Sequence, residues 1–453
     1  MLVACLRPLL CCALTAAGVL FSLCCSSQVQ PGERTQPHWF SLDGASRLRF
    51  EQLHGQYRVG REGSDQGLFL RTNVRARARF SSVLLETEVL DARHVLGIAD
   101  GGSPLSASTI NPLDVLQANL QFNTGQFAKF GPGVLKLGRF TMDLGSGRFV
   151  TRNGTRNTIN SYAGLEWSWG GAQGSQWRAF YTSPVQRRVD GLALDNRAKT
   201  DQVQAKARFW GLHNSSQTGA LKTQWFWFGL KEQDAVNQPS ANRNIDTLGV
   251  SLATTPGPGR WMAEVETAAQ WGEVWRGSQG RQKHSAYFFH LTGGYQIDST
   301  RNTLWALHYD YVTGDVTGDD NPADQRSQGF DSLFGGRRGD FGPTGIFGPF
   351  TRTNLNTPGL SLTTSPSPRW QLKAMARGYW LASQSGGLPA AGITSNQASS
   401  RYIGSQASLR LRWRPSAPWL LDATAAYLAA GDVLEHVGKG DARYAYLALT
   451  YQF

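Results

Sequence analysis

Arginines fill the odd positions of one short segment, at Arg71, Arg75, Arg77 and Arg79, with Asn73 as the exception. The even positions between them are mostly apolar. A guanidinium group keeps its charge at physiological pH and donates two parallel hydrogen bonds to a carboxylate. Because a period of two residues places alternate side chains on one face of a β-strand, the segment predicts a strand with one basic, anion-attracting face.

A second strand is predicted directly after a Ser-Ser turn, over residues 82–93. In the resulting hairpin two glutamates fall on the arginine face. We therefore predict two charge pairs across the hairpin, Arg77 with Glu86 and Arg75 with Glu88.

The bulk composition restricts the class of protein that carries this hairpin. The chain has 453 residues, of which 40% are hydrophobic and 17% charged, and its formal net charge is +12. This charge favours an anionic partner. The apolar residues are scattered singly, and no segment approaches the run of about 18 that a membrane-spanning helix needs. An exported chain with alternating hydrophobicity instead predicts a closed transmembrane β-barrel.

The first 27 residues differ from the rest of the chain. They contain all five cysteines, one basic residue (Arg7), an apolar run and then small residues. This pattern predicts a secretory signal peptide that is cleaved near Ser27, with a membrane anchor or a lipoprotein signal as alternatives. The mature chain would then have neither disulfides nor a thiolate metal site. The expected organisation is a signal peptide over 1–27, an N-terminal segment over 28–45 and one all-β barrel over 46–453 with a long loop at 314–354.

About 18 antiparallel strands are predicted for this barrel, an even number as in most single-chain bacterial barrels. They cover residues 46–58, 67–80, 82–93, 113–124, 134–142, 161–170, 175–184, 200–211, 220–231, 244–254, 259–272, 284–297, 301–313, 355–364, 369–382, 401–414, 418–429 and 443–453. The connections between them alternate between short and long. The last strand ends at Phe453, which resembles the signal that the barrel insertion machinery recognises.

The charged face of each strand is predicted to line the lumen, since an arginine that faces lipid near the midplane costs about 2–4 kcal/mol. The basic residues assigned to the lumen by parity are Arg47, Arg49, Arg71, Arg75, Arg77, Arg79, Lys206, Arg208, Lys373, Arg377, Arg410, Arg412 and Arg414. The acidic ones are Glu51, Glu86, Glu88, Glu264, Glu266 and Asp310. This excess of basic residues predicts a channel that concentrates anions. For any single arginine, a purely structural role in a mixed charge ladder remains the alternative.

Two motif regions carry a family resemblance. Residues 135–167 contain Leu-Gly-Arg at 137–139, Gly-Ser-Gly-Arg at 145–148, an Arg/Asn-rich loop at 152–157 and Ser-Tyr-Ala-Gly at 161–164. Together with Phe-Asp-Ser-Leu-Phe at 330–334, this region resembles the alginate export family of outer-membrane porins. The resemblance implies an 18-stranded barrel with a basic lumen, and pore or constriction positions at Arg139, Arg148, Arg152, Arg156, Arg337 and Arg338. Phe140 and Thr141 stand where that family usually has Gln-Glu.

Together these features predict a channel in the bacterial outer membrane for an anionic polysaccharide, such as alginate or a related polyuronate. The alternative is a porin for small anions or organic acids. The expected partners are the transported anion, membrane lipid, the insertion machinery through Phe453 and periplasmic export proteins, but not nucleic acid. The loop 314–354 is either a constriction that folds into the lumen or an exposed mobile loop. Without a recognisable catalytic motif, neither an enzyme nor a metal or other cofactor is expected. A barrel enzyme or adhesion protein is the least favoured alternative.

Overall fold

The computed structural model describes residues 39–96, 106–127, 131–170, 174–188, 195–275, 280–297, 300–315, 326–337, 339–394 and 397–453. The chain divides into two units, Met1–Ser41 and Leu42–Phe453. In the first unit only Trp39–Ser41 is described, and the rings of Trp39 and Phe40 lie 5.7 Å apart. The predicted signal peptide lies outside the described residues.

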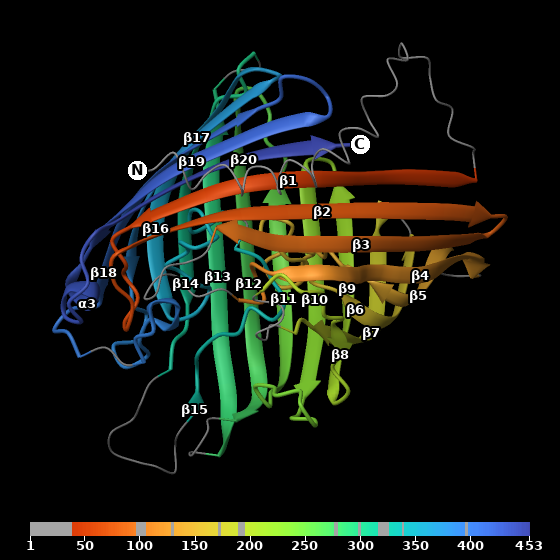
Figure 1. Ribbon diagram of the computed structural model, residues 1–453, viewed down its shortest axis with the longest axis horizontal. Helices are drawn as coiled ribbons and strands as arrows, with labels where there is room; N and C mark the ends of the chain where they lie inside the picture. Colours follow the sequence, from red (N-terminus) through yellow and green to blue (C-terminus); the bar gives the residue numbers. More distant parts are fainter. Residues whose placement is uncertain are drawn as a thin grey trace. The chain divides into compact units, whose positions relative to one another are not determined.

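The second unit is an antiparallel β-barrel (Figure 1). Its 18 long strands are β1 (Phe40–His54), β2 (Ser64–Phe80), β3 (Val83–Leu96), β4 (Asn111–Phe127), β5 (Gly131–Phe140), β6 (Tyr162–Gly170), β7 (Gln176–Gln186), β9 (Ala207–Thr218), β10 (Leu221–Glu232), β11 (Asn244–Thr254), β12 (Arg260–Trp275), β13 (Arg281–Gln296), β14 (Leu304–Val312), β16 (Leu355–Ser367), β17 (Trp370–Trp380), β18 (Tyr402–Trp413), β19 (Trp419–Ala430) and β20 (Ala442–Gln452). Each pairs with the next, and β1 pairs with β20 to close the sheet. The predicted fold class is therefore confirmed.

The short elements occur in the connections between these strands. They are β8 (Gln202–Val203), β15 (Arg326–Ser327), the 3-10 helix η4 (Pro389–Ala391) and the helix α3 (Asp432–Glu435). No helix among the described residues has the length and apolar character that a membrane crossing requires. One predicted strand is misplaced. It was expected over residues 200–211, whereas β9 begins at Ala207 and continues to Thr218.

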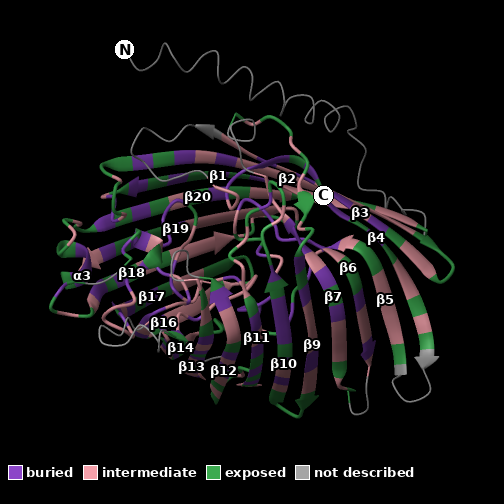
Figure 2. Ribbon diagram, turned by 90° about the horizontal axis from the view of Figure 1, so that it is seen from below, coloured by how far each residue is buried: buried purple, intermediate pink, exposed green. Residues whose placement is uncertain are grey.

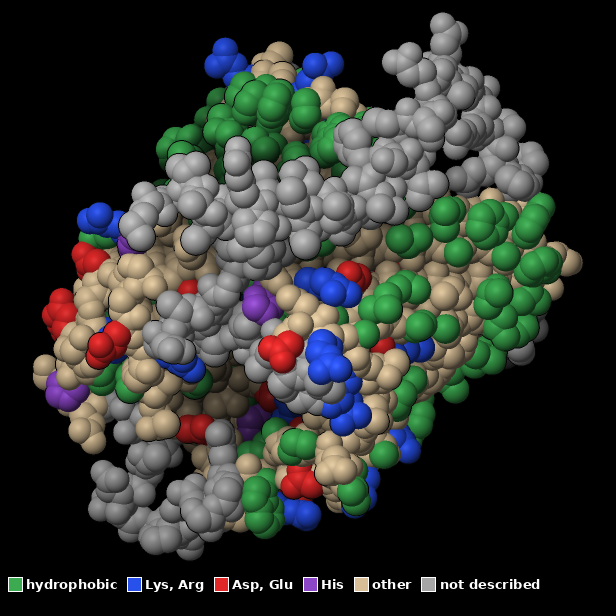
Figure 3. All heavy atoms as spheres, viewed as in Figure 1, with side chains coloured by type: hydrophobic (Ala, Val, Ile, Leu, Met, Phe, Trp, Pro, Cys, Tyr) green, Lys and Arg blue, Asp and Glu red, His purple; other side chains and the backbone are tan. Residues whose placement is uncertain are grey.

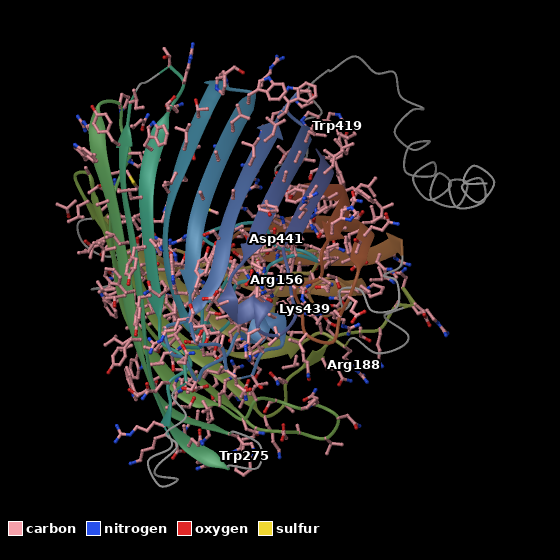
Figure 4. The ribbon with its side chains drawn as sticks, turned by 90° about the vertical axis from the view of Figure 1, so that its left-hand side faces the viewer. Arg156, Arg188, Trp275, Trp419, Lys439 and Asp441 are labelled. Carbon is pink, nitrogen blue, oxygen red and sulfur yellow. The ribbon has the colours of Figure 1, made fainter. Side chains whose placement is uncertain are left out.

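The two ends of the barrel differ in their connections, as predicted. Turns of two residues occur at one end, as at 81–82 and 368–369, whereas the connections 141–161 and 313–354 are at the other. Aromatic side chains gather near both ends, and Figure 4 shows Trp419 and Trp275 at opposite ends of the strands. Rings pair across neighbouring strands, at centroid distances of 5.1 Å for Trp370–Trp413, 4.7 Å for Trp419–Tyr451 and 5.3 Å for Trp380–Tyr402. Such girdles are typical of the two membrane–water interfaces.

Between these girdles the outer surface of the strands is apolar. In β14 the alternation is as predicted, with Leu307 69% exposed and Asp310 fully buried. In β18 the outward Leu409 is 54% exposed. Figure 3 shows hydrophobic side chains in broad patches over the strands at the right of the view. This surface is suited to contact with lipid.

Leu409→Arg is expected to impair assembly of the barrel, since an arginine on the lipid face costs about 2–4 kcal/mol near the midplane. The matched control is Ser408→Arg, one residue earlier on the same strand, because Ser408 lines an internal cavity. The folded fraction after refolding into lipid vesicles, read from heat-modifiable gel mobility, should fall for Leu409→Arg alone. Equal loss for both variants would contradict the assignment of the two faces.

The interior of the barrel is occupied by two of the long connections. We call the described residues of 141–161 and 313–354 the loop plug. They contact inward side chains on strands far apart around the barrel, including Glu51 on β1, Glu88 on β3, Glu266 on β12 and Arg377 on β17. Only a segment inside the barrel can reach all of these strands, and Figure 2 shows connecting segments within the ring of strands.

Aromatic side chains anchor the loop plug to the wall. The ring of Phe149 lies 4.9 Å from that of Phe226 and 5.5 Å from that of Phe288, while Phe350 stacks on Tyr379 at 3.5 Å. All five side chains are buried. The two connections also bond to each other, since the amide of Phe334 donates to the carbonyl of Phe149 at 3.0 Å. The described residues of the long loop thus pack into the lumen, one of the two predicted alternatives.

Candidate functional site in the barrel lumen

A cavity of 310 Å³, which we call the lumen cavity, lies between β1, β2, β17–β20 and the loop plug. Its charged lining residues are five basic side chains and one carboxylate: Arg47, Arg49, Arg71, Lys373, Arg410 and Asp422. All five basic residues were predicted to face the lumen from strand parity. The cavity therefore carries an excess of positive charge.

Three wall arginines hold the plug segment 154–157. Arg47 donates from Nη2 to the carbonyl of Arg156 at 2.7 Å, and Arg71 donates from Nη1 to the carbonyl of Gly154 at 2.7 Å. Arg49 donates to a neighbouring carbonyl of the same segment at 3.2 Å. Since a carbonyl accepts a hydrogen bond without carrying net charge, these contacts position the guanidinium groups and leave their positive charge in the cavity.

The other charges of the cavity differ in how far they are neutralised. Nε of Arg410 donates to Asp422 at 2.9 Å, and Arg49 lies 2.9 Å from Glu51. For Lys373, by contrast, no described residue supplies an ion-pair or hydrogen-bond partner. Lys373 is thus the cation of the lumen cavity that is most available to a passing anion.

A largely buried chain of charges fixes the loop plug to β12, β13, β14 and β17. We call it the charge cluster, and its members are Arg148, Glu264, Glu266, His290, Asp310, Asp340, Arg352 and Arg377. At its centre, Nη1 of Arg148 lies 2.5 Å from a carboxylate oxygen of both Glu264 and Glu266 on β12. Nε of Arg148 lies 3.0 Å from Asp340, which belongs to the second connection of the plug. One arginine therefore joins both connections of the plug to a strand.

The chain continues through β13, β14 and β17. His290 lies 2.7 Å from Asp310 through Nδ1, and Nε2 lies 2.8 Å from Nη2 of Arg148. Because a guanidinium can only donate, Nε2 of His290 accepts the hydrogen bond from Arg148, and Nδ1–H then donates to the carboxylate. Arg377 completes the chain at 2.6 Å from Asp310 and 2.5 Å from the backbone oxygen of Asp340.

Asp340 shows how strongly the plug depends on these charges. Burial alone would raise the pKa of its carboxyl group, but the guanidinium groups of Arg148 and Arg352 hold that pKa well below its ordinary value. Nη2 of Arg352 lies 2.8 Å from the same carboxylate oxygen. Removing one member of a buried, paired group leaves its partners desolvated and unpaired, so the charge cluster holds the plug as a unit.

The predicted register of the first hairpin is confirmed, because Arg75 lies opposite Glu88 and Arg77 opposite Glu86. The predicted side-chain pairs are wrong. Both arginines turn to Asp43 on the neighbouring strand β1, at 2.6 Å and 2.7 Å. One carboxylate on an adjacent strand is within reach of both long side chains, so register alone does not select the partner.

Glu88 instead binds the loop plug. Nη1 of Arg152 donates to it at 2.9 Å, and Gln117 and Asn73 donate to it at 2.5 Å and 3.0 Å. Glu86 is likewise buried on this inner face. Arg152, predicted as a constriction residue, therefore lies in the plug but has a carboxylate partner.

The lumen assignment of Lys206 and Arg208 is wrong. The fully buried residue of this segment is Phe209, whose ring lies 4.9 Å from that of Phe334 and 5.8 Å from that of Tyr162. Because the plug is aromatic here, β9 turns its apolar face inward. Arg208 is exposed and donates to Ser183 Oγ at 2.9 Å, and Lys206 precedes the strand.

The remaining predicted positions are spread over the barrel. Arg139 is next to the end of β5 and contacts Asp114, Ser161 Oγ at 3.2 Å and Asp201 at 3.7 Å. Arg412 lies 3.8 Å from Asp422, while Arg79 and Arg414 are exposed near the short turns. Arg156 and Arg337 line a second pocket that is described below. Arg338 lies outside the described residues.

The Asp201 carboxyl group beside Arg139 is expected to give a pH-dependent contribution to stability. Burial and the neighbouring carboxylate of Asp114 raise the pKa of Asp201 to about 6, so the folded protein favours its protonated form. This contribution is present below about pH 4, the unfolded value, and is lost as the pH rises through 6. Relative to Asp201→Asn, the wild type should lose on the order of 2 kcal/mol of unfolding free energy across this window.

Urea unfolding in detergent micelles at a series of pH values measures this difference. Glu62→Gln, at an exposed loop position, is the matched control and should follow the wild type. A constant difference between wild type and Asp201→Asn over the whole range would contradict the expectation.

Several residues of the site were not assigned to the lumen from the sequence. Asp340, Arg352 and His290 belong to the charge cluster, and Asp422 is the carboxylate of the lumen cavity. The only sequence signal was the concentration of Gly, Asp, Arg and Phe in the long loop, which does not indicate individual partners. Among the described residues, no group of three or more His, Cys, Asp or Glu is arranged to hold a metal ion.

Comparison with known proteins agrees with the fold. A family model described as alginate export matches residues 38–447. The chain resembles Acinetobacter baumannii OccAB1, with a TM-score of 0.60 and 10% identity over 93% of this chain and 99% of that chain. It resembles Pseudomonas aeruginosa OccK1 (OpdK), with a TM-score of 0.60 and 11% identity over 91% and 98%.

P. aeruginosa OpdK with vanillate is also similar, with a TM-score of 0.58 and 11% identity over 91% and 98%. Identity this low shows the fold alone. Among curated proteins none matches this chain. The family predicted from residues 135–167 and 330–334 is confirmed, as is the location in the bacterial outer membrane.

Proposed function

The chain belongs to the alginate export family of outer-membrane channels, and on that premise we propose that it conducts organic anions through the lumen cavity. With the loop plug inside the barrel, as in this structure, the transported anions are small carboxylates. The family and the barrel fold point to a transporter rather than an enzyme. We further propose that Phe453 directs insertion of the barrel, and that periplasmic partners set the direction of transport.

The charge of the lumen cavity is the observation that carries this proposal. Five basic side chains face one carboxylate, and Lys373 has no partner among the described residues. Arg47 and Arg71 are bonded to neutral carbonyls of the plug. A confined low-dielectric channel of this charge lowers the energy of an entering anion and raises that of a cation. Guanidinium groups add bidentate hydrogen bonding to carboxylates.

The size of the cavity supports small solutes over a polymer. At 310 Å³ the lumen cavity is at the lower end of the range of about 300–1,000 Å³ that is common for small-molecule sites. The loop plug closes it on one side through buried contacts. Vanillate, present in one similar structure, is a small carboxylate.

An anionic polysaccharide is the second candidate, and the description of the family as alginate export favours it. A polyuronate carries a carboxylate on each sugar, and successive units would meet the same basic side chains. For this substrate the loop plug would have to leave the lumen, at the cost of the contacts of the charge cluster.

Reconstitution in planar bilayers tests the proposal. Under a KCl gradient the reversal potential should have the sign of anion preference, and vanillate or galacturonate should reduce the chloride current at millimolar concentration. Block by alginate oligomers with no effect of the monomers would favour the polysaccharide. Equal permeability to K⁺ and Cl⁻ would overturn the assignment of an anion channel.

A further inference from the structure

A second, smaller pocket lies between β1 and the loop plug, beside the lumen cavity. We call it the inner pocket. Its volume is 80 Å³, and four guanidinium groups line it, those of Arg47, Arg49, Arg156 and Arg337, together with the single carboxylate of Glu51. Figure 4 shows Arg156 at a level between the barrel ends marked by Trp419 and Trp275. Four positive charges around a space this small repel one another, and a negatively charged group between them would relieve this repulsion.

Glu51 does not supply that counter-ion, because its oxygens are already used. One oxygen lies 2.9 Å from Nε of Arg49. The other accepts hydrogen bonds from the amide of Ile346 at 2.7 Å and from the hydroxyl of Tyr444 at 2.8 Å. The carboxylate is thus bound by the wall and the backbone of the plug, and its charge is offset by Arg49.

The guanidinium groups of Arg156 and Arg337 have no such partner. Within the described part of the chain, no acceptor receives a hydrogen bond from either side chain. Burial, the mutual proximity of the two groups and the nearby Arg187 lower the pKa of Arg156 to about 10. Arg337 is lowered to a pKa of about 10 by burial, with Arg58 and Arg352 nearby. These two groups belong to different connections of the plug.

The backbone is shaped to admit the Arg337 side chain. A Cβ atom at Gly348 would lie 2.2 Å from Nη1 of Arg337, and the φ angle there is +80°. Gly348 therefore leaves room that another residue would fill. Ser108, Thr109 and Thr344 also line the inner pocket. The hydroxyl of Thr109 donates to the carbonyl of Ser106 at 2.9 Å and that of Ser108 bonds to Ser106 Oγ at 2.7 Å, so Thr344 is the residue of the three whose hydroxyl can serve as a neutral donor. Several arginine forks around a small, partly enclosed space are an arrangement that binds an oxyanion.

We propose that the inner pocket holds one resident small oxyanion, which joins Arg156 to Arg337 and thereby joins the two connections of the loop plug. A volume of 80 Å³ suits an inorganic phosphate or a carboxylate the size of acetate, but not a sugar. The anion offsets like charges that would otherwise repel each other inside the barrel. The role of this anion is to stabilise the loop plug. The proposal does not depend on which solute passes through the lumen cavity.

Thermal unfolding of the folded protein in detergent tests this proposal. Sodium phosphate and sodium acetate are titrated separately, with a bulky sulfonate buffer salt keeping the ionic strength constant. One or both should raise the Tm saturably, by about 2–4 °C or more. A rise with phosphate alone identifies an inorganic ligand, whereas a rise with acetate alone identifies a carboxylate. The same Tm in all three salts would overturn the proposal.

The double variant Arg156→Gln/Arg337→Gln should lose the anion-dependent rise in Tm, while Lys373→Gln in the lumen cavity should keep it. An unchanged rise in the double variant would contradict the site. If the double variant does not fold, crystals of the wild type in arsenate and in bromoacetate decide the question. An anomalous peak between Arg156 and Arg337 supports the proposal, and its absence from both crystals overturns it. If the wild-type protein shows no anion preference in planar bilayers, that result counts against the proposed function alone and not against the resident anion.

Discussion

Arg148→Gln should open the barrel and raise its single-channel conductance several-fold. Arg148 is buried and lies within 3.0 Å of carboxylates from Glu264, Glu266 and Asp340. Glutamine leaves Glu264 and Glu266 without their positive partner, whereas Asp340 keeps Arg352. Breaking a buried ion pair in this way costs about 3–5 kcal/mol. The barrel wall is held by its own sheet, so the loop plug is the part that moves to relieve the cost.

Single-channel recording in planar bilayers measures this effect, together with the size of the largest permeant carboxylate. Arg208→Gln is the matched control, since this exposed arginine donates to Ser183 Oγ and nearby backbone carbonyls and lies outside the charge cluster. It should leave the conductance unchanged. A folded Arg148→Gln barrel with wild-type conductance would show that the charge cluster does not hold the plug in place.

Lys373→Gln should weaken anion preference without disturbing the plug. The side chain lines the lumen cavity and has no partner among the described residues, so its removal leaves no unpaired carboxylate. A unit charge about 6 Å from a permeating anion contributes about 0.7 kcal/mol in a water-like medium and about 2.8 kcal/mol at an effective dielectric constant of 20. The ratio of chloride to potassium permeability should therefore fall about 3-fold or more.

Reversal potentials under a KCl gradient give this ratio. Arg414→Gln, at an exposed position near a short turn, should retain the wild-type value. Asp422→Asn should act in the opposite direction, because it removes the only carboxylate among the described lining residues of the lumen cavity. An unchanged ratio in Lys373→Gln would mean that the lumen cavity is not on the ion path.

The class of the protein could be predicted from the sequence because its signals are local. An alternation such as Leu307 against Asp310 depends on neighbours two or three residues apart, and it marks the lipid face and the inner face of one strand. Turn residues then bound each strand, which makes the count of 18 recoverable. The motifs at 135–167 and 330–334 indicated the family for the same reason.

The tertiary structure decided which hydrogen-bond or ion-pair partner each charged side chain has. Arg47 holds a carbonyl 109 positions away in the chain, and Arg148 reaches a carboxylate 118 positions away. These contacts exist because two connections fold back into the barrel, and no local pattern encodes where a loop will lie. The same folding put aromatic residues against β9, which turned Phe209 inward and Arg208 outward.

Strand identity, the faces of most strands and the family were thus determined by the sequence itself, since each depends on a period of two residues or on a contiguous motif. The faces of β9 were the exception. The partners of the arginines, the shape of the lumen cavity and the inner pocket were decided only by the fold. Each requires side chains from several strands and both connections to meet in one place, and the energy of a buried charge depends on all of them together.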